Sequence, residues 1–96
     1  MQFVIGVYSA PGTPGAQAAY RFIQTLLQKK HHVTEIFFYE AGIAHADLPS
    51  PFEALNINLT VCSTLKPTPT RKTVLPQSLT LYLKAILDAD RHVIFR

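Results

Sequence analysis

The chain has one cysteine, few charged residues and no hydrophobic run long enough to cross a membrane. A lone Cys62 cannot form an internal disulfide, which excludes the class of small secreted domains that disulfides stabilise. The longest apolar stretch near the start, Phe3 to Tyr8, is far too short for a membrane span and lacks the features of a signal peptide. We therefore expect a cytoplasmic protein whose cysteine stays a free thiol.

Several catalytic signatures are also missing. The four histidines form no HExxH motif and no cluster with cysteine, so we expect surface histidines and no metal site. Asp47, Asp88 and Asp90 fall at predicted turns, which gives no support to a hydrolase with paired carboxylates. The loop from Ser9 to Gly15 lacks the lysine of a P-loop and the spacing of a dinucleotide fingerprint. It is favoured as a tight turn, and a phosphate- or flavin-binding loop stays the alternative.

The formal charge of +3 comes from Lys and Arg residues that are scattered along the chain. Only Lys29-Lys30 and Arg71-Lys72 are adjacent. No basic stripe interleaved with aromatic residues is present, so we expect no direct nucleic-acid binding.

Apolar residues make up 48% of the 96 residues, which is enough for one core and predicts one domain over residues 1–96. Short β-branched and aromatic runs predict buried strands, and apolar positions spaced three and four apart predict helices. The predicted strands are 3–8, 33–39, 55–62 and 93–95, and the predicted helices are 18–30, a short one around 43–47, and 79–87. Residues 64–76, with three prolines, predict a loop. This order indicates a small three-layer α-β-α domain with a short, mainly parallel sheet.

The last long helix should begin at a Ser78 cap. Its spacing predicts an inward face formed by Leu79, Tyr82, Leu83, Ile86 and Leu87.

Cys62 is the leading candidate for chemistry because of its position. It ends the third predicted strand, and the carboxyl ends of parallel strands form the edge where ligands and reactive groups gather. Lys66, Arg71 and Lys72 follow within a short loop and could stabilise a thiolate, the form that attacks sulfur and stores it as a persulfide. The alternative is an inert cysteine in the core.

One string of residues is similar to a known family. Residues 37–46 read Phe-Phe-Tyr-x-x-Gly-Ile-x-x-Ala, and they follow matching segments in residues 3–8, the Gly12 and Gly15 loop, and the first helix. A further match covers Leu79-Thr-Leu and residues 88–95. The sequence resembles the DsrE-like family of sulfur-relay proteins, most closely its TusD branch, over most of the chain. The resemblance implies a DsrEFH-like, flavodoxin-like topology.

What the resemblance implies is a sulfurtransferase subunit. A cysteine at the end of the third strand would accept persulfide sulfur from a carrier protein and pass it onward, as in tRNA 2-thiouridine synthesis or sulfur oxidation. The resemblance implies no cofactor, and assembly with itself or with sister subunits from dimer to hexamer. Ungapped alignments place Asn58 or Thr60 at the family cysteine, and Cys62 reaches that position if the segment after it is shortened. An inactive structural subunit is therefore the alternative.

Overall fold

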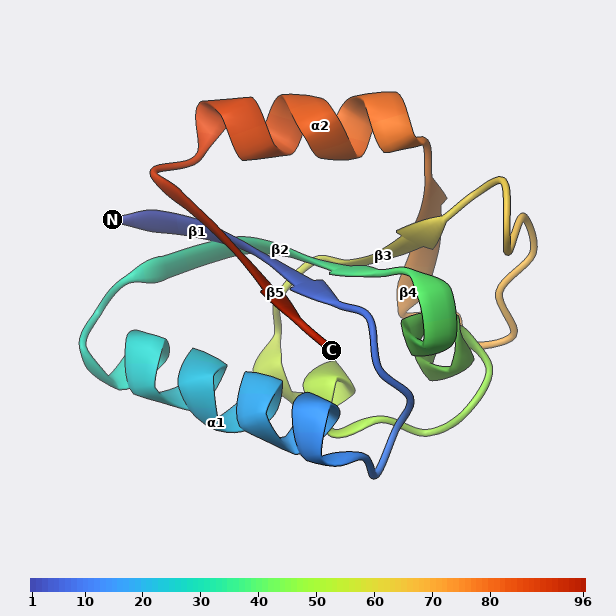
Figure 1. Cartoon of the computed structure of the whole chain (residues 1–96), viewed down its shortest axis with the longest axis horizontal. Helices are drawn as coiled ribbons and strands as arrows, with labels where there is room; N and C mark the ends of the chain where they lie inside the picture. Colours follow the sequence, from blue (N-terminus) through green and yellow to red (C-terminus); the bar gives the residue numbers. More distant parts are fainter.

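The computed structural model describes residues 1–96 and contains one five-stranded sheet in which every strand pair is parallel. The strands lie in the order β4-β3-β2-β1-β5 (Figure 1). Their bounds are β1 Gln2–Val7, β2 His32–Phe38, β3 Leu59–Cys62, β4 Val74–Gln77 and β5 Arg91–Phe95. The predicted α/β class with a parallel sheet is therefore confirmed.

Helices cover the two faces of the sheet unequally. Helix α1 (Pro14–Gln28) and two 3-10 helices, η1 (Glu40–Ala46) and η2 (Pro51–Leu55), lie on one face, and α2 (Leu79–Asp88) lies alone on the other (Figure 1). Right-handed crossovers explain this division. The connections from β1 to β2 and from β2 to β3 move toward one edge of the sheet, and the connection from β4 to β5 moves back toward the other edge. Connections that move in opposite directions with the same handedness lie on opposite faces of the sheet. Neither α-helix has both the length and the apolar character needed to span a bilayer.

The α1 face carries the larger core. Thr13 caps α1 by accepting a hydrogen bond from the Ala16 N–H, and Pro14 occupies the first turn, where a missing N–H costs nothing. The buried stripe of α1 packs on alternate residues of the strands. This core includes Ile5, Val7, Ala19, Ile23, Leu26, Ile36, Phe38, Phe52, Leu59, Val61 and Val74.

The opposite face of the sheet carries a smaller core. Its fully or nearly fully buried members are Val4, Phe37, Cys62 and Tyr82. The predicted Ser78 cap of α2 is confirmed, since the Ser78 Oγ accepts a hydrogen bond from the Leu81 N–H.

The predicted inward face of α2 is largely wrong. Tyr82 is buried and Ile86 packs against the core, but Leu79, Leu83 and Leu87 are exposed, Leu87 by 75%. The helix meets the sheet through a stripe at Tyr82, Ala85, Ile86 and Ala89. Both stripes have helical spacing, and the more hydrophobic one, with the leucines, was predicted to be buried. In the structure, the Tyr82 ring and the small residues Ala85 and Ala89 face the sheet instead.

The segment 55–77 differs most from the prediction. Asn56 ends η2 in a left-handed conformation, so β3 begins only at Leu59. The predicted proline-rich loop contains β4, which pairs in parallel with β3. A proline within a strand argues against a central position, but β4 is an edge strand, where Pro76 needs no N–H on its open side.

The string that carries the family resemblance forms the junction between β2 and η1. Phe37 and Phe38 face opposite sides of the sheet and belong to the smaller and the larger core, respectively. At Gly42 the backbone of η1 passes directly over the end of β1, and an added Cβ would lie 1.9 Å from the Val7 carbonyl oxygen. Close packing at this junction therefore explains the two aromatic residues and the glycine of the string.

Candidate functional site

Cys62 is the last residue of β3, at the carboxyl edge of the sheet where the sequence placed it. Its neighbour in the ladder is Gln77 of β4. The side chain points to the α2 face and is only 1% exposed. In the isolated chain the thiol is therefore closed to solvent.

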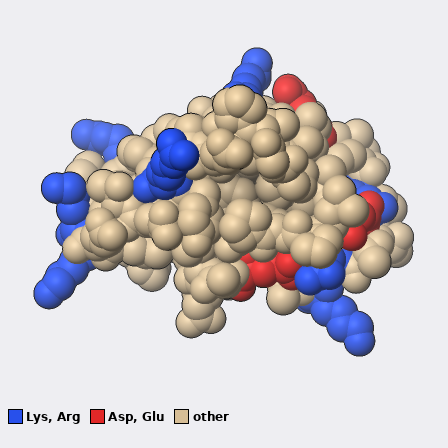
Figure 2. Space-filling model, turned by 90° about the horizontal axis from the view of Figure 1, so that it is seen from below, with Lys and Arg blue, Asp and Glu red and all other residues tan.

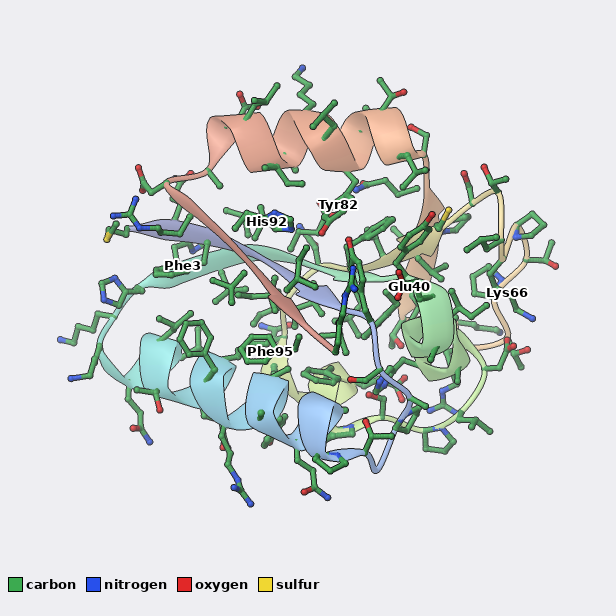
Figure 3. All side chains as sticks on the ribbon, viewed as in Figure 1. Phe3, Glu40, Lys66, Tyr82, His92 and Phe95 are labelled. Carbon is green, nitrogen blue, oxygen red and sulfur yellow. The ribbon has the colours of Figure 1, made fainter.

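An aromatic layer covers the same face. The Tyr82 ring of α2 stacks on Phe37 with ring centroids 3.8 Å apart. The Tyr82 hydroxyl lies 2.5 Å from the His92 Nε2 and 3.4 Å from the Tyr8 hydroxyl, so β1, β5 and α2 meet at this point (Figure 3). Burial raises the pKa of Tyr82 and lowers the pKa of His92, which favours the neutral form of both groups.

The cations predicted to support a thiolate are engaged elsewhere. The Lys66 Nζ lies 2.6 Å from the Asp47 Oδ2, although the Lys66 N–H donates to the Cys62 carbonyl oxygen. Arg71 makes a two-point contact with Glu53, at 3.0 Å from Nη2 and 3.3 Å from Nε.

Lys72 is exposed and forms no ion pair. Lys66 and Arg71 are thus held by carboxylates in the isolated chain, and support of a Cys62 thiolate by these three residues stays a prediction. The loop that carries the cations turns toward the face of η1 and η2, and Lys66 lies on it beyond the sheet edge, far from His92 (Figure 3).

The two alternative positions for a family cysteine have structural partners of their own. Asn58 is exposed ahead of β3, and its side-chain amide donates to the Thr34 carbonyl oxygen. Thr60 is buried on the same strand face as Cys62, and its hydroxyl donates to Glu35 at 2.7 Å. A two-residue displacement along β3 therefore keeps a side chain on the α2 face, as the strand period requires.

The loop proposed as a phosphate or flavin site is fixed to the start of α1 by hydrogen bonds at Thr13. The Thr13 N–H donates to the Ala10 carbonyl oxygen, and the N–H groups of Ala16 and Gln17 donate to the Thr13 hydroxyl and carbonyl oxygens. A cavity of about 300 Å³ lies beside the loop, with Gly12, Tyr20, Arg21 and His45 in its wall.

His45 is a buried residue that sequence reasoning placed on the surface. Its Nδ1 lies 2.7 Å from the Ser50 Oγ and its Nε2 3.0 Å from the Ser9 carbonyl oxygen, and its ring stacks on Phe38. The Ser9 carbonyl oxygen can only accept, so the Nε2 carries the proton and Ser50 donates to Nδ1. His45 lies one 3-10 turn after the buried Gly42, so both residues face the core.

Burial lowers the pKa of His45 in the folded chain, and this has a testable consequence. Below the ordinary histidine pKa of 6.5, the unfolded chain binds the proton more readily, so this contribution to stability falls as the pH falls. We expect urea unfolding at pH 7.5 and pH 5.5 to show a larger loss of stability in wild type than in His45→Gln. The variant removes the titrating group, so equal losses in the two proteins would contradict this role of His45.

Charge on the α1 face is dispersed. Seen from below, the Lys and Arg side chains stand around the rim, several of them at one end, and most of the face carries neither sign (Figure 2). The acidic groups near the η1 and η2 helices pair with Lys66 and Arg71. This face therefore offers no continuous basic surface.

The fold and the site define a small parallel α/β protein with one cysteine at the end of β3, and comparisons with known proteins show what this chain is similar to. The crystal structure of the YchN protein from E. coli superposes with a TM-score of 0.75 at 18% identity, covering 99% of this chain and 100% of YchN. No family model matches the chain.

Among curated proteins, the sulfurtransferase TusD of Proteus mirabilis is 39% identical over 66 residues, which covers 53% of this chain and 51% of that protein. A TusD homolog of Haemophilus influenzae is 38% identical over 48 residues, covering 49% and 38%. TusD of Serratia proteamaculans is 45% identical over 38 residues, covering 40% and 30%. The predicted resemblance to DsrE-like proteins of the TusD branch is confirmed, and the chain spans about half or less of the length of these relatives.

Proposed function

We propose that this chain is a subunit of a sulfur relay of the TusD type, in which sulfur is accepted and passed on as a persulfide. The carrying observation is the 39% identity to a curated TusD sulfurtransferase in a chain whose whole length has the fold of YchN. The partners are then a sulfur carrier protein that donates and a further protein that accepts.

Cys62 is the residue that we assign to this transfer. It is the one cysteine of the chain and it ends β3 at the carboxyl edge of the sheet. The Cys62 thiolate attacks the outer sulfur of the carrier persulfide, a new S–S bond forms, and the carrier sulfur leaves as a thiolate. The proton that Cys62 loses is balanced by the one that the carrier thiolate takes up, and no oxidant or reductant is consumed.

This transfer requires Cys62 to become accessible. The thiol lies beneath Tyr82, and α2 is fixed to the sheet through a narrow stripe while its leucines stay exposed. A helix with few buried apolar contacts belongs to the part of a fold that opens at low free-energy cost. We therefore expect the first half of α2 to move away from β3 when the carrier docks.

A second candidate function is a structural subunit that transfers no sulfur. The burial of Cys62 and the pairing of Lys66 and Arg71 with carboxylates both favour it. In this case the thiol is a small apolar core residue, and the chain contributes surface to a complex whose chemistry is elsewhere.

Replacement of TusD in a bacterium that lacks it distinguishes the two candidates. Wild type, Cys62→Ser and Cys62→Ala are expressed at matched levels, and the 2-thiouridine content of tRNA is measured. The sulfur carrier predicts that only wild type restores the modification. Restoration by all three proteins would favour the structural subunit, and failure of all three, each shown to be folded and expressed, would contradict both relay roles.

The exposed face of α2 supports assembly with a second copy or with sister subunits. Leu79, Leu83 and Leu87 follow one stripe of this short helix and are each at least 45% exposed. Monomeric soluble proteins rarely expose contiguous apolar patches of this kind.

Light scattering after gel filtration tests the self-assembly. We expect wild type to be larger than a monomer and Leu83→Gln combined with Leu87→Gln to be monomeric. A monomeric wild type would exclude homo-oligomers and leave sister subunits as the partners.

A further inference from the structure

Glu35 is an acidic residue in the middle of the apolar strand β2, and the sulfur relay does not use it. Its side chain is 9% exposed and faces the α2 side of the sheet. Two neutral donors hold one of its oxygens, Oε2: the Thr60 hydroxyl at 2.7 Å and the Gln77 side-chain amide. The carboxyl group is therefore fixed in place by neighbours from β3 and β4.

The other oxygen, Oε1, receives no hydrogen bond from the chain. The only side-chain polar atom that is both sealed from solvent and unpaired is the Ser9 Oγ, so Glu35 Oε1 must be reached from outside. No Lys, Arg or His forms an ion pair with Glu35. A buried carboxylate without a cation is costly, and burial raises the pKa of Glu35.

Two cavities adjoin this carboxyl group. The larger, of about 320 Å³, opens between β2, β3 and β4 and is lined by Glu35, Asn58, Thr60, Thr73, Leu75 and Gln77, among others. The smaller, of about 210 Å³, opens toward the end of α2 at Ala85 and Ala89. Polar groups that accept or donate hydrogen bonds thus surround one anchored acid, and Leu75 supplies an apolar wall.

We propose that the larger cavity binds an organic cation, an ammonium or guanidinium group on a short apolar stem, with the Glu35 carboxylate as its acceptor. The bound cation supplies the positive charge that no side chain of this protein places beside Glu35. The Thr60 hydroxyl oxygen can accept one of its remaining N–H groups, and the stem lies against Leu75. Two sources share this chemistry: a free small amine or guanidine, and the Lys or Arg side chain of a partner protein. The proposal stands whether or not Cys62 carries sulfur.

Titration by ¹H–¹⁵N NMR tests the site. The probes are n-butylguanidinium, its neutral counterpart n-butylurea, and a short capped peptide with one arginine between two leucines. We expect saturable shifts of the amides at residues 35, 58–60, 73–75 and 77 with the two cations and not with the urea. Glu35→Gln keeps the shape of the side chain and should weaken cation binding about tenfold or more, because it removes the buried charge.

Matched variants complete the test. Glu40→Gln removes an exposed carboxylate outside the cavity and should leave binding unchanged. Leu75→Trp places a large ring at the exposed cavity wall and should block binding while Glu35 stays intact. Tighter binding of the peptide assigns the site to a partner side chain, and equal or tighter binding of n-butylguanidinium assigns it to a free cation. Equal affinity in wild type and Glu35→Gln, equal affinity in wild type and Leu75→Trp, or no saturable shift would overturn the proposal.

Discussion

Gly42→Ala is expected to lower the stability of the fold by about 3 kcal/mol, the upper end of the usual cost of overpacking. The added Cβ would lie 1.9 Å from the Val7 carbonyl oxygen, which is backbone and cannot rotate aside. That oxygen also accepts the Tyr39 N–H, so η1 can move away only by disturbing the end of the β1–β2 pair. Thermal unfolding should show a fall in Tm of roughly 15 °C for a chain of this size.

Gly12→Ala is the matched control. Gly12 has a φ of +81°, but no atom lies within 4 Å of an added Cβ, so only backbone strain opposes the substitution. That strain costs about 1 kcal/mol. If Gly42→Ala lowered Tm by no more than Gly12→Ala, the close approach of η1 to β1 would be incorrect.

Tyr82→Ala is expected to have the second large effect, on both stability and the reactivity of Cys62. It removes the only buried residue of α2, together with the stack on Phe37 and the contact with His92. Truncation of a buried aromatic side chain costs about 3 kcal/mol or more. Because Cys62 packs in the same small core, its labelling by a thiol reagent under native conditions should accelerate by roughly tenfold or more.

Three controls separate local opening of α2 from global unfolding. Tyr82→Phe keeps the stacked ring and should label nearly as slowly as wild type. Leu83→Ala changes an exposed position of the same helix and should have little effect. Gly42→Ala is similarly destabilised away from α2, so its labelling reports global unfolding alone. Equal labelling rates in Tyr82→Ala and wild type would show that α2 does not protect the cysteine.

The parts of the fold that the sequence predicted are those with strong periodicity. The apolar runs at β1 and β2 form the buried centre of the sheet, and the apolar stripe of α1 packs against it, so the predicted pattern and the structure agree. Strand β4 was missed because Pro76 and the prolines before it indicate a loop, and only the edge position in the sheet makes that proline acceptable. The sheet order that decides this is a long-range property.

The packing side of α2 shows a different limit. Leucines predict a buried face, but the sheet beneath α2 carries Phe37, so a flat ring at Tyr82 fits there. The leucines of α2 that face away from the sheet are typical of a surface that a partner covers. The sequence of one chain does not contain that partner, so its pattern predicted the wrong buried face.

The candidate site was predicted in position and missed in surroundings. The strand pattern placed Cys62 at the carboxyl edge of the sheet, and the structure agrees. Sequence proximity suggested that Lys66 and Arg71 lie near the thiol, but the ion pairs with Asp47 and Glu53 depend on how η1 and η2 fold against the loop. Glu35 carried a usable signal, a lone acid inside an apolar strand.

The central claim, that Cys62 carries sulfur, is tested most directly by mass spectrometry of the intact protein after incubation with a persulfidated carrier protein. The account predicts a gain of one sulfur atom on wild type, removed by a reductant and located on the fragment that contains Cys62, with no gain on Cys62→Ser. A wild-type chain that stays unchanged in mass, or a Cys62→Ser chain that gains sulfur equally, would contradict it.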